Sequence, residues 1–214
     1  MSDTPLVHRT RRANGTPEGL LVLLHGRGAD EHDLEPLLEA IDPRRRFVGV
    51  LPRGPLSLPP GGAHWYVVRR IGYPDPDTFL ATFARLSAWV DARAEEFGIP
   101  PERIVLSGFS QGAVMSYALG LAAARPAPAG VLAMSGFIPR VEGFELDAPS
   151  RRGLPVSISH GSHDPVIGVQ WGRDARDRLS RAGVAVRYRE DPVGHTISAG
   201  ALAQVREVLA SLPA

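Results

Sequence analysis

The chain has 214 residues, of which 43% are hydrophobic and 22% are charged. This length and composition suit one globular domain spanning residues 1–214, and they exclude the disordered and collagen-like classes of protein. Because the formal charge is only +1, the sequence predicts neither nucleic acid nor an anionic membrane as a partner. The absence of cysteine excludes disulfides, thiolate metal sites and cysteine nucleophiles. The longest early apolar run, residues 20–24, is too short for a signal-peptide core or a membrane span, so we expect no membrane insertion and a cytoplasmic location.

Short runs of valine, isoleucine and leucine alternate along the chain with segments of helical period. Such alternation predicts the α/β class, with a mostly parallel sheet covered by helices. The predicted strands are residues 20–24, 47–51, 104–107, 131–134, 156–159 and 184–188. The predicted helices are residues 77–97, 111–124, 171–181 and 199–212.

The segment between the second predicted strand and the first predicted helix, residues 52–76, is rich in proline and glycine and surrounds His64-Trp65-Tyr66. Proline and glycine interrupt regular structure, so we expect a long loop beside the sheet. Loops of this length often carry function.

A serine flanked by glycines stands directly after the third predicted strand, in Gly108-Phe109-Ser110-Gln111-Gly112. Glycines two positions before and after a serine permit a sharp turn from a strand into a helix, and this turn exposes the serine hydroxyl. The helix that follows points its N-terminus at negative charge developing near that hydroxyl. We therefore interpret Ser110 as a nucleophile.

A serine nucleophile needs a base to remove its proton, and the base needs a carboxylate to orient it. In the fold class with this turn, the acid and then the histidine follow the serine along the chain. His195 lies between the last predicted strand and the last predicted helix, so we predict it as the base. Asp164 stands just past the strand at 156–159 and is the predicted acid. The alternative acid is Asp191, four residues before His195.

Acyl transfer to a serine also requires two N–H donors for the oxyanion of the tetrahedral intermediate. The backbone N–H of Gln111, directly after the nucleophile, is one predicted donor, and the backbone N–H of Arg27 is the second. Arg27 lies in Leu24-His25-Gly26-Arg27-Gly28, after the first predicted strand, where glycines let the backbone approach a substrate closely. We interpret His25 as structural, bonded to backbone within this turn, with a contact to substrate as the alternative.

Metal binding is the competing interpretation of His160, His163, Asp164 and His195. A His-x-x-His pair fits a metal less naturally than an i, i+4 pair on a helix, and no further carboxylate is suitably placed. We therefore expect no metal, and interpret His160 and His163 as residues that shape their loop.

Several segments together resemble the small carboxylesterases that include acyl-protein thioesterases and lysophospholipases. The resemblance implies the α/β-hydrolase fold, with a mostly parallel central sheet flanked by helices, no large cap domain and no cofactor. It also implies Ser110, Asp164 and His195 as the catalytic triad. The segments that carry it are residues 24–30, Gly108-Phe109-Ser110-Gln111-Gly112, Met134-Ser135-Gly136-Phe137-Ile138-Pro139, residues 160–165 and Gly194-His195.

One segment departs from the family pattern. Where the family commonly has an aromatic-Phe-Asp segment before its long helix, this chain has His64-Trp65-Tyr66-Val67-Val68. Substrate preference is therefore not carried over from the better-known members. Apolar side chains commonly line acyl-binding clefts. For each candidate residue, ordinary packing in the core is an equally good interpretation. The candidates are Trp65, Tyr66, Phe137 and Ile138, together with Leu56 and Leu58.

These features predict a serine hydrolase that cleaves carboxylic esters through an acyl-enzyme on Ser110, with thioesters and lysophospholipids as further candidate substrates. One alternative is a ligand-binding protein of the same fold without catalysis. Another is an enzyme that transfers acyl groups or cleaves lactones with the same residues. The predicted partner is a small-molecule ester, and a second copy of the chain in a homodimer is a further candidate partner.

Overall fold

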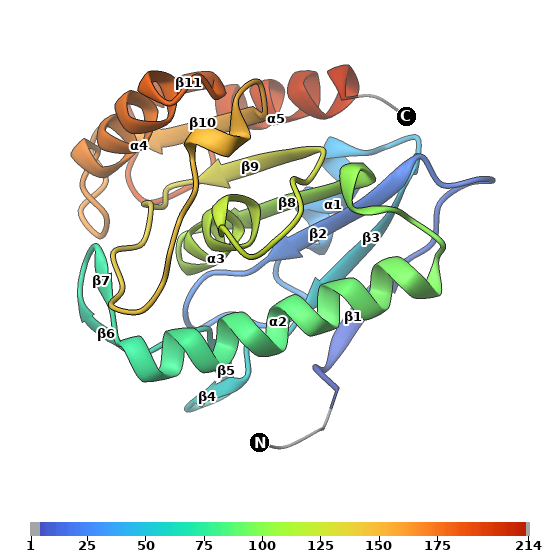
Figure 1. Cartoon of the computed structure of the whole chain (residues 1–214), viewed down its shortest axis with the longest axis horizontal. Coiled ribbons are helices and arrows are strands. Elements are labelled where there is room, and N and C mark those ends of the chain that lie inside the picture. Colours follow the sequence, from blue (N-terminus) through green and yellow to red (C-terminus); the bar gives the residue numbers. More distant parts are fainter. Residues whose placement is uncertain (1–4, 213–214) are drawn as a thin grey trace.

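The computed structural model describes residues 5–212 and has a central sheet with helices on both faces (Figure 1). In this part of the chain, seven strands form the sheet in the order β1-β3-β2-β8-β9-β10-β11. β1 (His8–Arg11) pairs antiparallel with β3 (Phe47–Pro52), and every other neighbouring pair is parallel. The remaining strands of this sheet are β2 (Gly19–Leu24), β8 (Ile104–Phe109), β9 (Gly130–Met134), β10 (Pro155–Gly161) and β11 (Ala185–Asp191).

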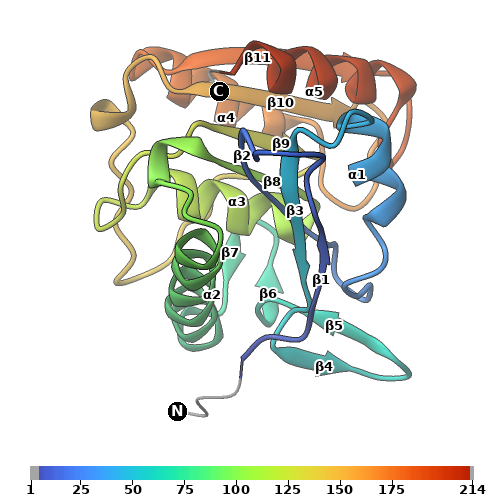
Figure 2. The ribbon, with the colours of Figure 1, turned by 90° about the vertical axis from the view of Figure 1, so that its right-hand side faces the viewer.

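The helices divide between the two faces of the sheet (Figure 2). α2 (Pro76–Glu96), α3 (Gln111–Leu121) and α4 (Gln170–Arg181) pack on one face, and α1 (Glu35–Ile41) and α5 (Ala199–Ser211) pack on the other. Short 3₁₀ turns at Pro101–Arg103 and Pro149–Arg151 precede β8 and β10. Within residues 5–212, no helix is both long and apolar enough to cross a membrane.

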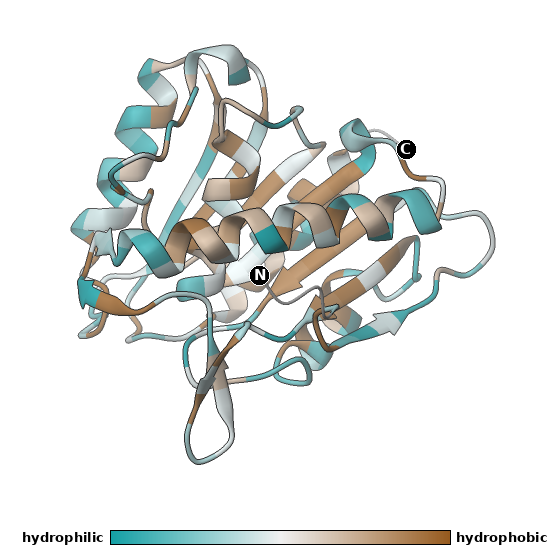
Figure 3. Ribbon diagram, turned by 60° about the horizontal axis from the view of Figure 1, so that its bottom comes forward, coloured by the Kyte–Doolittle hydropathy of each residue, from teal (hydrophilic) through white to brown (hydrophobic). Residues whose placement is uncertain are grey.

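The central strands are the most hydrophobic part of the ribbon (Figure 3). Every residue of β2 and β3 is buried, because helices cover both faces of the sheet at its centre. β11 lies at the edge of the sheet, and its residues are exposed or half-buried. Continuous apolar runs in the sequence therefore mark the central strands, whereas an edge strand tolerates charged residues.

The structure confirms the mostly parallel sheet with flanking helices, and each predicted strand and helix overlaps an observed element. The predicted helix at 111–124 ends earlier, at Leu121, because Ala122 has an extended backbone and bridges to Leu146. The sequence did not predict β1 or α1. Residues 1–4 and 213–214 of the expected domain lie outside the described residues.

Residues 52–76 are more regular than the long loop that we expected. They form two small antiparallel pairs, β4 (Leu56–Leu58) with β5 (Gly62–His64), and β6 (Val68–Arg70) with β7 (Tyr73–Pro74). The segment ends at Asp75, whose side chain accepts a 3.0 Å hydrogen bond from the backbone N–H of Thr78 and caps α2.

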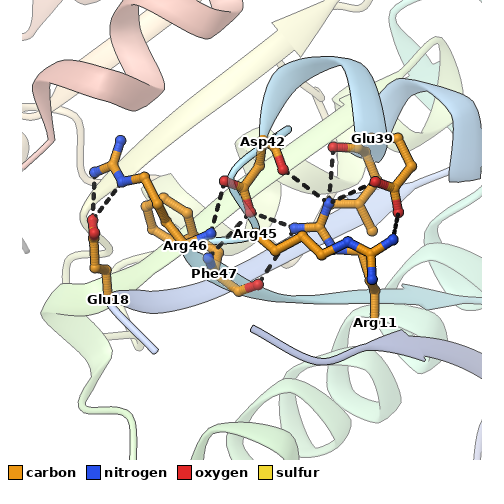
Figure 4. Close-up of polar contacts among 8 residues, drawn as sticks. Arg11, Glu18, Glu39, Asp42, Arg45, Arg46 and Phe47 are labelled. Carbon is orange, nitrogen blue, oxygen red and sulfur yellow. Dashed lines mark hydrogen bonds and ion pairs between the residues drawn. The ribbon is translucent and has the colours of Figure 1, made fainter. Parts of the chain in front are cut away.

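A buried carboxylate joins the antiparallel edge of the sheet to α1 (Figure 4). The side chain of Asp42, at the end of α1, forms an ion pair with Arg11 of β1. It also accepts hydrogen bonds from the backbone N–H groups of Arg46 and Phe47, at 2.9 and 3.1 Å. Arg11 in turn donates to the backbone oxygens of Leu38 and Asp42, at 3.3 and 3.1 Å. One carboxylate thus ties together β1, the end of α1 and the start of β3.

Replacing Asp42 should destabilise the fold strongly. Asp42→Ala leaves two backbone N–H groups without their acceptor and the Arg11 guanidinium without its buried carboxylate, so we expect the free energy of unfolding to fall by about 3 to 5 kcal/mol. Urea unfolding measures the change. The control is Asp91→Ala, because Asp91 pairs with Arg125 and its side chain is 60% exposed; its cost should stay below about 1 kcal/mol. Equal costs for the two variants would contradict this account.

Candidate active site

The turn from β8 into α3 places Ser110 in a strained backbone conformation. Its φ is +56°, in the left-handed region that a residue with a side chain rarely occupies. The two flanking glycines allow the turn: a methyl group on Gly108 would lie 2.4 Å from the carbonyl carbon of Gly112. A methyl group on Gly112 would lie 1.8 Å from the carbonyl oxygen of Leu24. The predicted turn is therefore present, and it is packed against the end of β2.

His195 lies between Ser110 and Asp164 and contacts both. Its Nε2 is 2.9 Å from Ser110 Oγ, and its Nδ1 is 2.7 Å from Asp164 Oδ2. Asp164 follows β10 and His195 follows β11, so all three side chains meet at the carboxyl ends of parallel strands. We call Ser110, His195 and Asp164 the Ser-His-Asp array. An array with this order of contacts can transfer the serine proton to the imidazole.

The alternative acid, Asp191, has other partners. Its carboxylate accepts two 2.7 Å hydrogen bonds from Arg189 and one of 2.5 Å from Ser198. Asp164, by contrast, has a fully buried side chain whose second oxygen accepts 2.9 Å hydrogen bonds from the backbone N–H groups of Val166 and Ile167. These two bonds hold the carboxylate in the orientation that faces His195.

Histidine 160 supports the loop that carries Asp164. Its buried imidazole lies with Nε2 2.6 Å from the backbone oxygen of Ile167 and 3.5 Å from Asp164 Oδ2. Its Nδ1 has no hydrogen-bond partner among residues 5–212. Burial lowers the pKa of His160, so the imidazole is neutral and Nε2 carries the proton that it donates to Ile167. This contact agrees with the interpretation that His160 shapes its loop.

His163, the neighbouring histidine, is exposed, and its backbone N–H donates to Val193. Asp164 and His195 are hydrogen-bonded to each other instead of sharing an open coordination site. In the described part of the chain, no group of three or more histidine, cysteine or acidic side chains is arranged to hold a metal ion. The expected lack of a metal stays a prediction.

The loop after β2 passes close to the nucleophile. A methyl group on Gly26 would lie 3.5 Å from Ser110 Cβ. The ring of His25 is bonded to backbone on both sides: Nδ1 is 2.7 Å from the oxygen of Gly26, and Nε2 accepts a 2.9 Å hydrogen bond from the N–H of Gly54. Burial lowers the pKa of His25, which keeps the ring neutral and able to accept at Nε2. These bonds support the structural interpretation of His25.

The four side chains predicted to line an acyl cleft belong to the hydrophobic core. Trp65, Tyr66, Phe137 and Ile138 are each at most 3% exposed, and all four pack within core clusters. This burial supports the packing alternative, and a contact of any of the four with substrate stays a prediction. Trp65 and Tyr66 lie in a segment rich in glycine and proline, and Phe137 and Ile138 follow a strand, so the sequence did not indicate that they are buried.

A groove of about 820 Å³ runs along α2, away from the Ser-His-Asp array. Leu56, which we expected in the acyl cleft, lines this groove together with Leu6 and Trp89. One side chain that the sequence analysis did not assign to the site lies beside the array: Phe109 packs its ring 4.8 Å from that of His195. The position of Phe109 directly before the serine was the signal that could have identified it.

Comparison with known proteins relates this chain to ester hydrolases. A family model described as phospholipase/carboxylesterase matches residues 8–212. A putative hydrolase of Bacillus subtilis, MhqD, is 29% identical over 193 residues, which cover 90% of this chain and 93% of the relative. Acyl-protein thioesterase 1 homolog 2 of Dictyostelium discoideum is 27% identical over 184 residues, covering 81% and 82% of the two chains. The crystal structure of a carboxylesterase from Mesorhizobium loti has a TM-score of 0.84 at 26% identity and covers 99% of this chain and 97% of that one.

The buried, neutral histidines predict a loss of stability in weakly acidic solution. The pKa values of His25 and His160 are lowered in the folded chain, whereas an unfolded histidine titrates near a pKa of about 6.5. As the pH falls below about 6.5, His25 and His160 become protonated in the unfolded chain at a higher pH than in the folded chain. The free energy of unfolding should therefore decrease, by at most about 1.4 kcal/mol per pH unit for each histidine.

The contribution of His160 to this pH dependence can be isolated. His160→Gln keeps an N–H donor near the position of Nε2 and does not titrate. Urea unfolding at about pH 7 and about pH 5.5 should show a smaller decrease in the variant than in the wild type. Identical decreases in the two proteins would show that His160 does not contribute.

Proposed function

Because this chain belongs to the phospholipase/carboxylesterase family of ester hydrolases and has the α/β-hydrolase fold that its motifs predict, we propose that Ser110, His195 and Asp164 form its catalytic triad. The observation that carries the proposal is the pair of hydrogen bonds at His195, 2.9 Å to Ser110 and 2.7 Å to Asp164. One imidazole in contact with a hydroxyl and a buried carboxylate can act as a general base and then as a general acid.

The first half of the reaction forms an acyl-enzyme. Ser110 Oγ attacks the ester carbonyl carbon while His195 Nε2 takes its proton, and Asp164 Oδ2 stabilises the resulting imidazolium through Nδ1–H. The backbone N–H groups of Gln111 and Arg27 donate to the oxyanion of the tetrahedral intermediate. The intermediate then collapses: the ester C–O bond breaks, and His195 gives its proton to the departing alkoxide, which leaves as an alcohol.

The second half hydrolyses the acyl-enzyme. Water attacks the acyl carbon and gives a proton to His195, and the same two N–H groups stabilise the second oxyanion. When this intermediate collapses, the bond to Ser110 Oγ breaks and His195 returns the proton to that oxygen. The carboxylic acid leaves, and the enzyme regains its starting state.

The proposed substrates are small-molecule carboxylic esters. Thioesters are a second candidate, because one relative is named an acyl-protein thioesterase and the same acyl-enzyme would form with a thiolate as the leaving group. A complete array supports catalysis over simple ligand binding, and product analysis with an added alcohol separates hydrolysis from acyl transfer. A cytoplasmic location stays a prediction, and a homodimer stays open.

Removing the proposed nucleophile should abolish ester hydrolysis. We expect Ser110→Ala to reduce kcat for p-nitrophenyl esters by about 10⁶-fold, because without Oγ no acyl-enzyme forms. Steady-state rates with an ester series from acetate to palmitate measure this loss. Ser150→Ala is the control, because Ser150 is exposed and its hydrogen-bond partner within residues 5–212 is Asp147. Hydrolysis by Ser110→Ala at a rate near that of the control would rule out the proposed nucleophile.

Replacing each candidate acid with asparagine shows which of the two supports His195. Asp164→Asn keeps the size of the side chain but removes the negative charge that orients His195 and stabilises its imidazolium, so kcat should fall by about 10⁴-fold. Asp191→Asn is the matched control and should keep kcat within a few-fold of the wild type, because the Asp191 carboxylate contacts Arg189 and Ser198 instead of His195. The reverse order of the two effects would assign the acid to Asp191.

A further inference from the structure

Tryptophan 65 has two polar groups, and each is bonded to a different part of the proposed active site. The side chain is fully buried. Its indole N–H donates a 2.8 Å hydrogen bond to the backbone oxygen of His25. Its backbone N–H donates a 3.0 Å hydrogen bond to Oε1 of Gln111. Trp65 therefore contacts both the loop after β2 and the first residue of α3.

Glutamine 111 holds the segment of Trp65 at a second point. Its Nε2 donates a 3.0 Å hydrogen bond to the backbone oxygen of Tyr66, so both ends of its side-chain amide bind backbone of residues 65 and 66. The side chain of Gln111 is buried at the start of α3, next to Ser110. Its amide thus fixes residues 65 and 66 relative to the nucleophile.

The other end of the connection lies at His25. The oxygen of His25 accepts the indole N–H of Trp65, and a methyl group on Gly112 would lie 2.7 Å from that same oxygen. The start of α3 therefore packs directly on this peptide group. Arg27, the second proposed oxyanion donor, is two residues further along this loop. The position of its N–H relative to Ser110 depends on where the His25 peptide is held.

We infer that Trp65 is a positioning residue for the oxyanion hole, because its indole and backbone N–H groups connect the two segments that carry the donors. This inference rests on the proposed function. An oxyanion hole works only when its N–H groups lie about 2.7 to 3.1 Å from the position of the developing oxyanion. Trp65 sets the spacing between the segments of Gln111 and Arg27 without touching the substrate.

Core packing alone would give Trp65 a role in stability and none in the reaction. The chain contains a matched control for this distinction. Trp89 is also buried, at 6% exposed, but its indole Nε1 has no hydrogen-bond partner among the residues that the structure describes. Trp65→Phe and Trp89→Phe remove the same atoms from the core, and only Trp65→Phe removes a hydrogen bond to the loop of the oxyanion hole.

The experiment compares both variants with the wild type in stability and in kinetics. We expect both to lose stability, and only Trp65→Phe to lose kcat for a p-nitrophenyl ester, by about tenfold or more, since removal of a whole oxyanion donor costs about 10² to 10³. KM should change less than about threefold, because the donors act mainly on the tetrahedral state. The Ki of a trifluoromethyl ketone, which forms a tetrahedral adduct with the serine, should rise in parallel with the loss of kcat.

Two outcomes would overturn the inference while leaving the proposed function intact. One is a kcat for Trp65→Phe equal to that of Trp89→Phe in an enzyme that still requires Ser110. The other is a loss of kcat with no change in the Ki of the ketone. An inactive wild type would instead overturn the proposed function, and the inference with it.

A second pair of variants applies the same test if Trp65→Phe does not fold. Gln111→Met keeps the backbone N–H of residue 111 but removes both bonds to residues 65 and 66. Its control is Gln204→Met, because Gln204 is equally a buried glutamine and its side-chain amide bonds to Ser157, Ile158 and Arg187. We expect kcat and ketone affinity to fall in Gln111→Met alone. Equal kcat and equal Ki in the two variants would overturn the inference.

Discussion

The close contact between the ends of β2 and β8 and the start of α3 is the constraint on which the proposed active site depends. Gly112 packs directly on the carbonyl group of Leu24, at a distance that leaves no room for a side chain. The chain must therefore turn sharply between Gly108 and Gly112, and Ser110 takes a positive φ as a result. This strain places the hydroxyl above the sheet, where side chains from other strand ends can reach it.

The parallel sheet supplies those side chains. In a parallel sheet all carboxyl ends lie along one edge, so loops after β10 and β11 deliver Asp164 and His195 to the same place as Ser110. The three residues are far apart in sequence, yet each lies within one short loop of its strand. The surrounding backbone then fixes their orientation, through the N–H groups that bind Asp164 and through the ring of Phe109 beside His195.

Sequence patterns could predict this array because each member directly follows a predicted strand. Apolar runs identify the buried strands β8 and β10, β11 alternates small or apolar residues with charged ones, and the glycines around Ser110 stand between a strand and a helix as the sharp turn requires. The same patterns could not predict β1, whose four residues are all polar and either exposed or half-buried, and which pairs antiparallel with β3 at the edge of the sheet. Short edge strands depend on their partner more than on their own composition.

The role of Trp65 was outside the reach of sequence patterns for a similar reason. Its neighbours in sequence are typical of a surface loop, and an aromatic residue in such a loop suggested a substrate contact. Its hydrogen-bond partners, His25 and Gln111, lie 40 and 46 residues away in the sequence. Contacts over such separations leave no periodic signal in a single sequence.

The most direct test of the central claim, that the reaction passes through an acyl-enzyme on Ser110, is to trap that intermediate. The protein would be incubated with a fluorophosphonate, which phosphonylates an activated serine, and the modified residue would be located by peptide mass spectrometry. The account predicts one phosphonyl group per chain on the peptide that contains Ser110, and none after His195→Ala. Modification of another residue in the active wild type, or full activity after Ser110 is modified, would contradict it.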